Sequence, residues 1–437
     1  MNRFIIQGGK PLFGKVKIGG AKNASYKLII ASLLTDQKVT LKNIANIGDV
    51  VITRAVAQSL GAKTKASNNT LTIESQHLSN FKVEEKIGQK SRCSTVFAAP
   101  LLVRFGKAQV PFPGGDKIGC RPIDRHLRGL KSLNIDFCQK GINYFLQTKG
   151  IIGSNYRFEK NTHTGTETLI MVASLAKGET LLKNASQEPE VDELITFLNK
   201  MGGKIKRVAP RTIKIIGVKK LHGTTHTLMP DRNEAVSFAV AALATKGDIF
   251  IENIKAGPLT AFLRKVKEAG GGYEIKNHGL RFFYQQPLRS CNITTSPHPG
   301  FMTDWQPLWT TLMTQAQGKS KIVERIHNFR FHFVADLKKM GAKITLFNPK
   351  VQNPDRFYNF NLFDDKKEYF HAAEVSGPSL LKPIKTKVSD IRAGATLVLA
   401  ALIAKGKSTL SDIYHIDRGY EHLDLKLKKL GANIKRA

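Results

Sequence analysis

The sequence has 437 residues, 41% of them hydrophobic, which is enough for two domains of about 200 residues with buried cores and excludes a disordered chain. Its 68 Lys and Arg residues against 34 Asp and Glu give a formal net charge of +34, which predicts an anionic partner. No apolar run approaches the about 20 residues of a transmembrane helix, and the N-terminal residues lack the pattern of a signal peptide. We therefore expect a cytoplasmic protein without membrane insertion.

The basic charge leaves two interpretations of different class open. One is a protein that binds polyanions through charge alone, and the other is an enzyme with an anionic small-molecule substrate. Lys and Arg are spread along the chain, and no known nucleic-acid-binding motif is present, so we expect no specific nucleic-acid function. The cysteines lack metal-ligand spacing and are predicted to be free thiols: Cys93, Cys120, Cys138 and Cys291. We predict no metal site and no cofactor.

An eighteen-residue pattern occurs six times along the chain. The copy from Ser389 reads SDIRAGATLVLAALIAKG, and the six copies are residues 20–37, 89–106, 161–178, 230–247, 301–318 and 389–406. The spacing is about 70 residues, rising to about 90 before the last copy, which indicates one supersecondary unit used six times. The middle of each copy is nearly continuous Ala, Leu, Val, Ile and Met, which predicts a buried helix, usually ended by Gly.

A second set of signals recurs with the same period. Amphipathic helices are predicted to end at Leu60–Gly61, Leu133–Asn134, Met201–Gly202, Ala269–Gly270, Met340–Gly341 and Leu430–Gly431, most of them followed by a short strand. Further strands follow the buried helices, as in KVTLKNI and DIFIENI. The sequence therefore predicts an α/β fold of two similar domains with three units each. The extra segment from Pro349 to Lys385 is predicted to be an enlarged hairpin or surface loop without chemistry.

The first turns of the six buried helices are polar. They carry Lys22, Asn23, Arg92, Thr164, Gly165, Asp231, Arg232, Asp304, Asp390 and Arg392. If the units pack with one symmetry, these starts converge, and free backbone N–H groups together with Lys and Arg form an anion site. The alternative is ordinary capping by Asp, Asn and Thr, which accounts poorly for Arg92 and Arg392.

Several motifs together carry a resemblance to a known family. They are GAKNA from Gly20, PFPGGDKIGCRPID from Pro111, SQEPEV from Ser186, SPHPGFMTD from Ser296, DIRAGATLVLAA from Asp390 and YHIDRGYEHLDLKLKKLGA from Tyr414. The chain resembles, nearly end to end, the UDP-N-acetylglucosamine 1-carboxyvinyltransferase family of enolpyruvyl transferases. The resemblance implies two inside-out α/β barrels with an interdomain active-site cleft. It also implies a discontinuous layout, with residues 22–230 and their mobile loop 113–121 as one domain and residues 1–21 with 231–437 as the other.

The reaction that the resemblance implies transfers enolpyruvyl from phosphoenolpyruvate to the 3-hydroxyl of UDP-N-acetylglucosamine, which opens peptidoglycan precursor synthesis. It needs an acid for the methylene carbon, a base for the hydroxyl, and cations for a phosphate and a carboxylate. By resemblance, Lys22, Arg121 and Arg392 contact phosphoenolpyruvate, with Asn23 assisting and Arg418 closing on it. The planar fork of Arg suits both anionic groups.

Asp304 matches the family residue that contacts the sugar hydroxyl and is the favoured base, and N-capping is its alternative role. The resemblance places the nucleotide sugar along Arg92, Arg121, Pro122, Ile123, Asp124, Arg125, Asn161, His163, Thr164, Gly165, Ile326 and Arg330. The sequence departs from commoner members at this site, with Asn161 where Lys is frequent and His163 where Ser is frequent. Asn328–Phe329–Arg330 replaces the more usual Glu-Asn-Arg, which keeps Arg330.

The general acid is the largest departure, because most members carry Cys in the mobile loop and this chain has Asp116. Cys120 is not its replacement, since a shift of that length would also move Arg121. An exposed Asp with a pKa near ~3.9 is ionised at neutral pH, so the role requires loop closure or an acidic ligand to raise that pKa. The alternative is a surface Asp in a flexible loop.

Three functional hypotheses follow from these residues. The first is an active transferase with Asp116 as acid and Asp304 as base. The second is a divergent paralogue that binds a nucleotide sugar without this turnover or uses another acceptor, and the third is a polyanion-binding protein. Lys22–Asn23 argues against the shikimate-pathway relative, whose first helix carries Lys-Ser. The sequence does not determine the oligomeric state, and a monomer is compatible with it.

Overall fold

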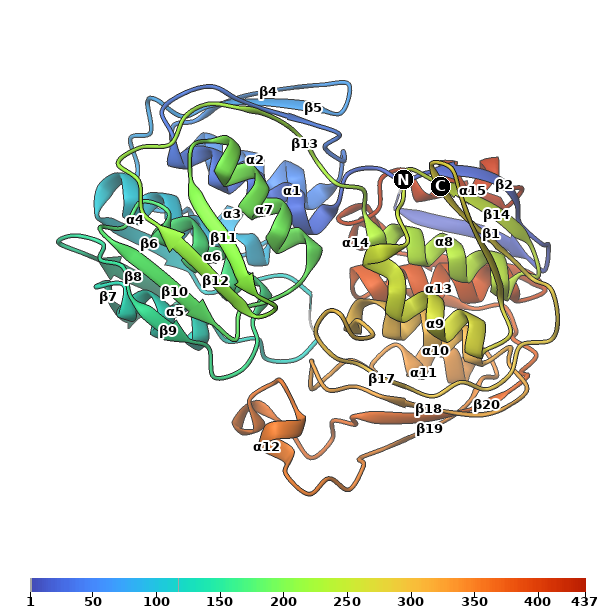
Figure 1. The fold of residues 1–437 in the computed structure, drawn as a ribbon. Helices are drawn as coiled ribbons and strands as arrows, with labels where there is room; N and C mark the ends of the chain where they lie inside the picture. Colours follow the sequence, from blue (N-terminus) through green and yellow to red (C-terminus); the bar gives the residue numbers. More distant parts are fainter. Residues whose placement is uncertain (1, 117) are drawn as a thin grey trace. The chain divides into compact units, whose positions relative to one another are not determined.

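A computed structural model describes residues 2–116 and 118–437 and shows two compact units (Figure 1). Unit 1 comprises Met1–Gly19, Asp116–Arg121 and Pro230–Ala437, and unit 2 comprises Gly20–Gly115 and Pro122–Met229. The sequence had assigned the whole loop 113–121 to the domain 22–230, whereas residues 116–121 group with unit 1. Met1 and Lys117, which fall within the predicted domain and loop, lie outside the described residues.

Each predicted eighteen-residue copy contains a buried helix that begins two or three residues after the copy starts. The inner helices of unit 2 are α1 (Lys22–Ala31) with η1 (Ser32–Leu34), η2 (Arg92–Phe97) continuing into α4 (Ala98–Phe105), and α6 (His163–Ala173). Those of unit 1 are α8 (Arg232–Ala244), η4 (Thr303–Trp305) continuing into α10 (Gln306–Met313), and α13 (Ile391–Ile403). Two of the six therefore open with a 3₁₀ segment.

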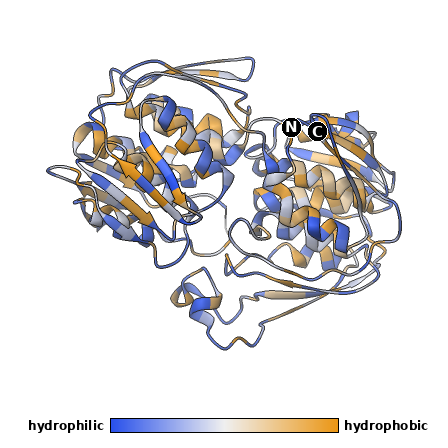
Figure 2. Cartoon of the chain, in the orientation of Figure 1, coloured by the Kyte–Doolittle hydropathy of each residue, from blue (hydrophilic) through white to orange (hydrophobic). Residues whose placement is uncertain are grey.

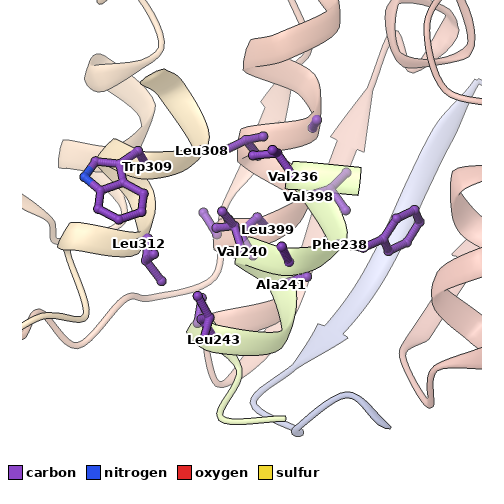
Figure 3. Packing of buried hydrophobic residues seen from close by; sticks show 14 of the residues in the cluster. Val236, Phe238, Val240, Ala241, Leu243, Leu308, Trp309, Leu312, Val398 and Leu399 are labelled. Carbon is purple, nitrogen blue, oxygen red and sulfur yellow. The ribbon is translucent and has the colours of Figure 1, made fainter. Parts of the chain in front are cut away.

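Apolar content on every side explains why these helices lie inside. All residues of α8 are buried, so the helix has no solvent-facing stripe. Figure 3 shows Leu308 of α10 and Val398 and Leu399 of α13 beside the side chains of α8, and the elements are in contact. The described residues form two separate hydrophobic cores, one in each unit.

The predicted amphipathic helices are also present. They are α2 (Gly48–Ser59), α5 (Asp124–Ser132), α7 (Pro189–Lys200), α9 (Thr260–Glu268), α11 (Val334–Lys339) and α15 (Leu423–Lys429). Two residues after the last residue of each helix, the chain passes through the left-handed region, where Gly or Asn carries the smallest steric cost: Gly61, Asn134, Gly202, Gly270, Gly341 and Gly431. The helix ends predicted from the sequence are confirmed.

Unit 2 contains three sheets. In spatial order they are β13 (Thr225–Thr227), β3 (Val39–Lys42), β5 (Thr70–Glu74) and β4 (Lys63–Ser67); then β6 (Lys107–Pro111), β8 (Asn143–Gln147) and β7 (Asp136–Lys140); and then β11 (Lys204–Ala209), β12 (Thr212–Ile216), β10 (Glu179–Lys183) and β9 (Asn155–Arg157).

Unit 1 also contains three sheets. They are β15 (Gly272–Lys276), β16 (Gly279–Phe283), β14 (Asp248–Glu252) and β2 (Phe13–Lys17); then β17 (Ile293–Thr294), β18 (Gly318–Val323), β20 (Ala372–Gly377) and β19 (Lys343–Phe347); and then β21 (Lys385–Lys387), β22 (Gly406–Ser411), β1 (Arg3–Gly8) and β23 (Asn433–Arg436). Strand β1 is antiparallel to β22 and β23, and β2 is parallel to β14. These pairings anchor the N-terminal segment in the C-terminal half of the chain.

The hydropathy pattern matches this arrangement, because the inner helices of both units are predominantly apolar and loops are predominantly hydrophilic (Figure 2). Short helical segments α3 (Glu85–Gly88), η3 (Gly257–Leu259) and α14 (Tyr414–Asp417) occupy connections. Across residues 2–116 and 118–437, we find no helix of sufficient length and apolarity to cross a membrane.

The predicted insertion is a long connection within the hairpin of β19 and β20. It spans residues 348–371 and contains α12 (Pro354–Phe357) and η5 (Leu362–Asp364). The prediction of an enlarged hairpin is confirmed, but its predicted end at Lys385 is wrong, because residues 372–377 form β20 and Lys385 begins β21.

Candidate active site

Asp304 lies in η4, at the start of an inner helix of unit 1, with its side chain 24% exposed. Its Oδ1 accepts a hydrogen bond from Arg330 Nη2 at 3.2 Å, and its Oδ2 accepts one from Arg392 Nη2 at 3.2 Å. Asn233 Nδ2 approaches the same Oδ2 at 3.4 Å. Residue 302 is the N-cap of η4, so the alternative role of Asp304 as an N-cap is wrong. Its carboxylate is instead held by side-chain donors.

Arg392 lies in the first turn of α13 and is almost completely buried. Its Nη1 donates to the Tyr420 hydroxyl at 2.9 Å, and that hydroxyl also lies 2.8 Å from Ser237 Oγ. Burial acts to lower the pKa of Arg392, but Tyr420 and the neighbouring carboxylates outweigh it and raise that pKa above its ordinary value. Arg392 is therefore a fixed cation beside Asp304.

Arg330 lies in the loop before α11, where its charge acts on the buried Glu324 carboxylate. Arg330 is 2% exposed, and its Nη2 also donates to the Thr303 carbonyl at 3.3 Å. Glu324 accepts from the Thr303 hydroxyl at 3.0 Å and from the Ile326 backbone N–H at 2.7 Å. Burial raises the pKa of Glu324, and the charge of Arg330 opposes this rise. Ile326, predicted to contact the nucleotide sugar, is therefore linked through Glu324 to Thr303, the residue before Asp304.

Asp116 is not a solvated loop residue in this structure. Its side chain is 16% exposed, and its Oδ1 pairs with Arg418 Nη1 at 2.7 Å. The Asp116 carbonyl accepts a hydrogen bond from Arg121 Nη2 at 2.6 Å. Asp116, Arg121 and Arg418 therefore form a second group of predicted residues within unit 1.

Lys22 and Asn23 are the first two residues of α1 in unit 2. Lys22 Nζ pairs with Asp49 Oδ2 at 2.9 Å, and Asp49 lies in the first turn of α2. The N-cap of α1, Ala21, makes no side-chain hydrogen bond to the helix. Lys22 is thus held beside a helix start without a carboxylate cap.

The predicted nucleotide-sugar residues of unit 2 lie along the starts of three helices. Arg92 Nη2 donates to the Pro122 carbonyl at 3.5 Å, and Arg125 Nη1 donates to the Asn161 carbonyl at 3.2 Å. Ile123 is buried at the N-cap of α5. The predicted residues Asp124 and Arg125 open that helix, and His163, Thr164 and Gly165 open α6. The fold thus brings residues 92, 122–125 and 161–165 together.

A buried histidine that the sequence analysis missed joins two of these helices. His126 Nε2 lies 2.9 Å from Thr164 Oγ1. Burial and the charges of Arg92 and Arg125 lower the pKa of His126 to about 3, so its imidazole is neutral. Its neutrality leaves the positive charge of this region on the arginines.

Three further residues were missed, and each carries a signal that the sequence offered. Lys27 and Glu167 place charges in the middle of otherwise apolar helices, and they pair at 2.7 Å. Asn233 follows the predicted helix start at Arg232 and accepts from Trp305 Nε1 at 2.8 Å, besides approaching Asp304. Because these residues act only through long-range contacts, local patterns did not reveal their partners.

Comparisons with known proteins agree over the whole chain. A family model described as EPSP synthase (3-phosphoshikimate 1-carboxyvinyltransferase) matches residues 6–427. Proteins named UDP-N-acetylglucosamine 1-carboxyvinyltransferase are similar to this chain: the one from Koribacter versatilis is 38% identical over 440 residues and covers 100% of this chain and 96% of its own. The one from Geobacter metallireducens is 38% identical over 436 residues, with coverage of 100% and 99%.

Two solved structures share the mixed α/β fold. The enolpyruvyl transferase NikO from Streptomyces tendae matches with a TM-score of 0.86 at 21% identity, covering 99% of this chain and 98% of its own. An EPSP synthase from Acinetobacter baumannii matches with a TM-score of 0.70 at 16% identity and covers 100% of both chains. The family model and the full-length relatives together confirm the resemblance carried by the motifs: the chain belongs to the enolpyruvyl transferase family, among the UDP-N-acetylglucosamine 1-carboxyvinyltransferases.

Proposed function

We propose that this protein transfers the enolpyruvyl group of phosphoenolpyruvate to the 3-hydroxyl of UDP-N-acetylglucosamine and releases phosphate, the first committed step of peptidoglycan precursor synthesis. The names of its full-length relatives favour this reaction over the paralogue and polyanion hypotheses. The observation that carries the proposal is the Asp304 carboxylate, held by Arg392 and Arg330 at a partly exposed helix start. It combines a proton acceptor with cations for an anionic substrate.

The architecture supports the same proposal. In each unit, three sheets accompany three buried inner helices, and every inner helix begins at a polar turn. We assign each unit as an inside-out α/β barrel with three repeats. The boundaries proposed from the resemblance, at residues 21/22 and 230/231, fall close to the changes of unit after Gly19 and Met229.

The proposed chemistry begins at Asp304. As the sugar hydroxyl attacks C2 of phosphoenolpyruvate, a C–O bond forms, Asp304 accepts the hydroxyl proton, and a carboxylic acid supplies a proton to the methylene carbon. The tetrahedral adduct then loses phosphate and a methyl proton, which restores the double bond in the product. Engagement of Arg392 by an anionic substrate would remove a donor from Asp304 and make its carboxylate a stronger proton acceptor.

Asp116 is the proposed acid, and its ion pair with Arg418 sets the condition for that role. The Asp116 carboxylate is engaged by the Arg418 guanidinium at 2.7 Å, so it must leave this partner before it can act on the methylene carbon. Phosphoenolpyruvate, with a phosphate and a carboxylate, is a competing partner for the Arg418 guanidinium. We propose that substrate binding exchanges these partners and that Arg121 assists in holding the anionic groups. For Lys22 and Asn23, the assignment to phosphoenolpyruvate rests on the resemblance.

Unit 2 supplies the proposed binding residues for the nucleotide sugar. Arg92 and Arg125 provide positive charge near the start of α6, where the helix dipole also favours an anion, while the Gly165 N–H donates to the Thr162 cap. Pro122, Ile123, Asp124, Asn161 and His163 line the same helix starts. For Ile326 and Arg330, the assignment to the nucleotide sugar rests on the resemblance.

Phosphate release tests the proposal directly. The purified protein is incubated with both substrates, with each substrate alone, and with shikimate 3-phosphate in place of the nucleotide sugar. We expect phosphate only with phosphoenolpyruvate plus UDP-N-acetylglucosamine, and its loss in Asp304→Ala. If phosphate is released with shikimate 3-phosphate but not with UDP-N-acetylglucosamine, the proposed acceptor is wrong.

Two further outcomes would replace the proposal with the other hypotheses. Tight calorimetric binding of UDP-N-acetylglucosamine without phosphate release would favour the divergent paralogue. The polyanion-binding hypothesis would be favoured if the protein released no phosphate, bound no UDP-N-acetylglucosamine and retained DNA of any sequence at physiological salt. Retention at that salt is a strict criterion because charge-driven binding to DNA weakens steeply with salt.

A further inference from the structure

Two inner helices of unit 2 carry opposite charges in their buried middles. Lys27 of α1 and Glu167 of α6 are both 0% exposed, and Lys27 Nζ lies 2.7 Å from Glu167 Oε2. The Lys27 ammonium also lies 4.6 Å from the centre of the Tyr26 ring. Burying two charges is costly unless each is well paired, so this pair needs an explanation beyond packing.

The six-fold repeat shows that the architecture itself does not require these charges. At the position of Lys27, the other copies carry Val96, Thr168, Ser237, Leu308 and Thr396. At the position of Glu167 they carry Tyr26, Thr95, Val236, Pro307 and Ala395. All ten are uncharged and the corresponding helices still form, so the pair is specific to one place in unit 2.

His163 connects this pair to the candidate site. It is the first residue of α6, one turn before Glu167, and its side chain is 23% exposed. Its Nε2 lies 3.1 Å from Glu167 Oε1 and 3.4 Å from Lys27 Nζ. One ring nitrogen therefore faces the buried pair, and Nδ1 is the nitrogen left for a ligand.

The two charges restrict which nitrogen of His163 carries the proton. Lys27 can only donate, so its contact with Nε2 is favourable when Nε2 holds a lone pair and the proton is on Nδ1. Glu167 Oε1 approaches Nε2 at 3.1 Å but accepts no hydrogen bond from the residues that the structure describes, so the contact with Lys27 is the one that decides which nitrogen holds the lone pair. Burial opposes the charge on Lys27, but Glu167 outweighs it and the pKa of Lys27 is raised above its ordinary value. Lys27 thus remains a cation that disfavours a neutral Nε2–H ring.

The surroundings of His163 fit an anionic ligand. Thr164, the next residue, is held by His126, whose pKa is lowered partly by the charges of Arg92 and Arg125. The backbone of Gly165 lies in the first turn of α6, where the helix dipole favours negative charge. A protonated Nδ1 at this edge would add a directed donor to that environment.

We propose that Lys27 and Glu167 are positioning residues that orient His163 and keep a proton on its Nδ1, so that His163 donates a hydrogen bond to a phosphate oxygen of a nucleoside diphosphate. The ligand class rests on the proposed function. The orientation of the ring and the place of its proton rest on the Lys27–Glu167–His163 geometry alone.

Nitrogen-15 NMR of labelled histidine tests the proton position without activity. The chain has 12 His, and His163→Asn assigns the signal. At a pH of about 8, where an ordinary histidine is neutral, we expect the His163 signals of a protonated Nδ1. In Lys27→Met/Glu167→Met, which replaces the pair with apolar side chains, we expect the pattern of a neutral Nε2–H ring. A wild-type Nε2–H ring, or a pattern unchanged by the double substitution, would overturn the proposal.

Calorimetry with UDP as the probe tests the consequence for binding. We expect Lys27→Met/Glu167→Met to weaken UDP binding about tenfold when His163 is present. In the His163→Asn background, where the amide can donate from the position of Nδ1 without the pair, we expect the same double substitution to change the Kd less than about twofold. Equal weakening in both backgrounds would mean that the pair acts only through packing and would overturn the proposal.

A matched control is available in unit 1, where Lys426 pairs with Glu234 at 2.5 Å and both side chains are largely buried. Lys426→Met/Glu234→Met is expected to change thermal stability and leave the His163 signals in place, and a changed His163 pattern in this control would count against the proposal. The two proposals fail separately. If the protein releases no phosphate but the Lys27–Glu167 pair still affects UDP binding through His163, the proposed reaction is overturned and the positioning role is supported.

Discussion

The two units share one architecture but begin their inner helices with different chemistry. In unit 1, Asp231 and Asp390 cap α8 and α13, each accepting hydrogen bonds from two backbone N–H groups, and Asp304 stands in the first turn of η4. In unit 2, the N-caps are uncharged: Ala21 makes no side-chain bond, and Ser91 and Thr162 cap with hydroxyl groups.

Because of this difference, we expect the two units to have different roles. Carboxylates in unit 1 offset the partial positive charge of their helix starts and supply a proton acceptor. In unit 2 that partial charge remains available to a ligand and is reinforced by Lys22, Arg92 and Arg125. Substitutions in the carboxylate group of unit 1 are therefore expected to change turnover, and those in the cationic group of unit 2 to change affinity.

The largest expected effect is that of Asp304→Ala in unit 1. We expect kcat to fall about a thousandfold because the sugar hydroxyl loses its proton acceptor. Steady-state phosphate release measures it, and Asp248→Asn, which alters a surface ion pair of the same unit, is the control with activity close to wild type. If only the KM values change, Asp304 is a binding residue, and the expected division between turnover in unit 1 and affinity in unit 2 is wrong.

Asp116→Asn is expected to lower kcat about a hundredfold, because an amide cannot supply the proton to the methylene carbon. Asp116→Cys is expected to keep substantial activity, since the resemblance places a cysteine acid at this position in most members. The same phosphate assay distinguishes the two variants. Equal activity of Asn and Cys at this position would remove Asp116 from the acid role.

Arg125→Met sharpens the comparison from the side of unit 2. We expect the KM for UDP-N-acetylglucosamine to rise about tenfold with kcat within about twofold of wild type, because a cation at the α6 start is lost. Arg128→Met is the matched control on the same helix, since the Arg128 side chain is 58% exposed and pairs with Glu159 on the surface. A fall in kcat as large as that of Asp304→Ala would contradict the division.

The last prediction concerns stability, through His126. Its folded pKa of about 3 lies below the ordinary value of 6.5, so between these pH values the unfolded chain binds a proton that the folded chain does not. The contribution is therefore fully present above pH 6.5, and falling pH lowers the free energy of unfolding by at most about 1.4 kcal/mol per pH unit. His126→Gln removes this slope, as measured by urea unfolding, whereas His77→Gln at an exposed position leaves it unchanged. A slope unaffected by His126→Gln would show that the residue is not the buried neutral group.

The repeated pattern allowed the inner helices to be predicted, but not their ends: Gly106 is the left-handed C-cap of α4, whereas α6, α8, α10 and α13 end three to five residues before the predicted Gly. Apolar side chains on all faces and a terminal Gly or Asn are local properties, so the α8 and α13 segments were recognisable without knowing their partners. The roles of Asp231, Asp304 and Asp390 were not separable in this way. Asp231 and Asp390 are caps, whereas Asp304 accepts side-chain hydrogen bonds from guanidinium groups of distant segments.

Residues that act through buried pairs depended still more on the fold. The sequence identified Asp116 as the candidate acid, with a surface loop residue as the alternative, but it did not reveal the partner Arg418, which lies 302 positions away. Lys27 and Glu167 are 140 positions apart, so the sequence did not show that these two buried charges form a pair.

The sequence by itself determined the repeat, the helix and strand types, the turn residues and the family, because these follow from short-range periodicity, backbone preferences and contiguous motifs. Only the tertiary structure decided which carboxylates cap helices, which one the arginines hold, and which buried charges meet. The physical reason is that ion pairs act over a few ångströms in space, and the chain brings such atoms together only after the inner helices have packed.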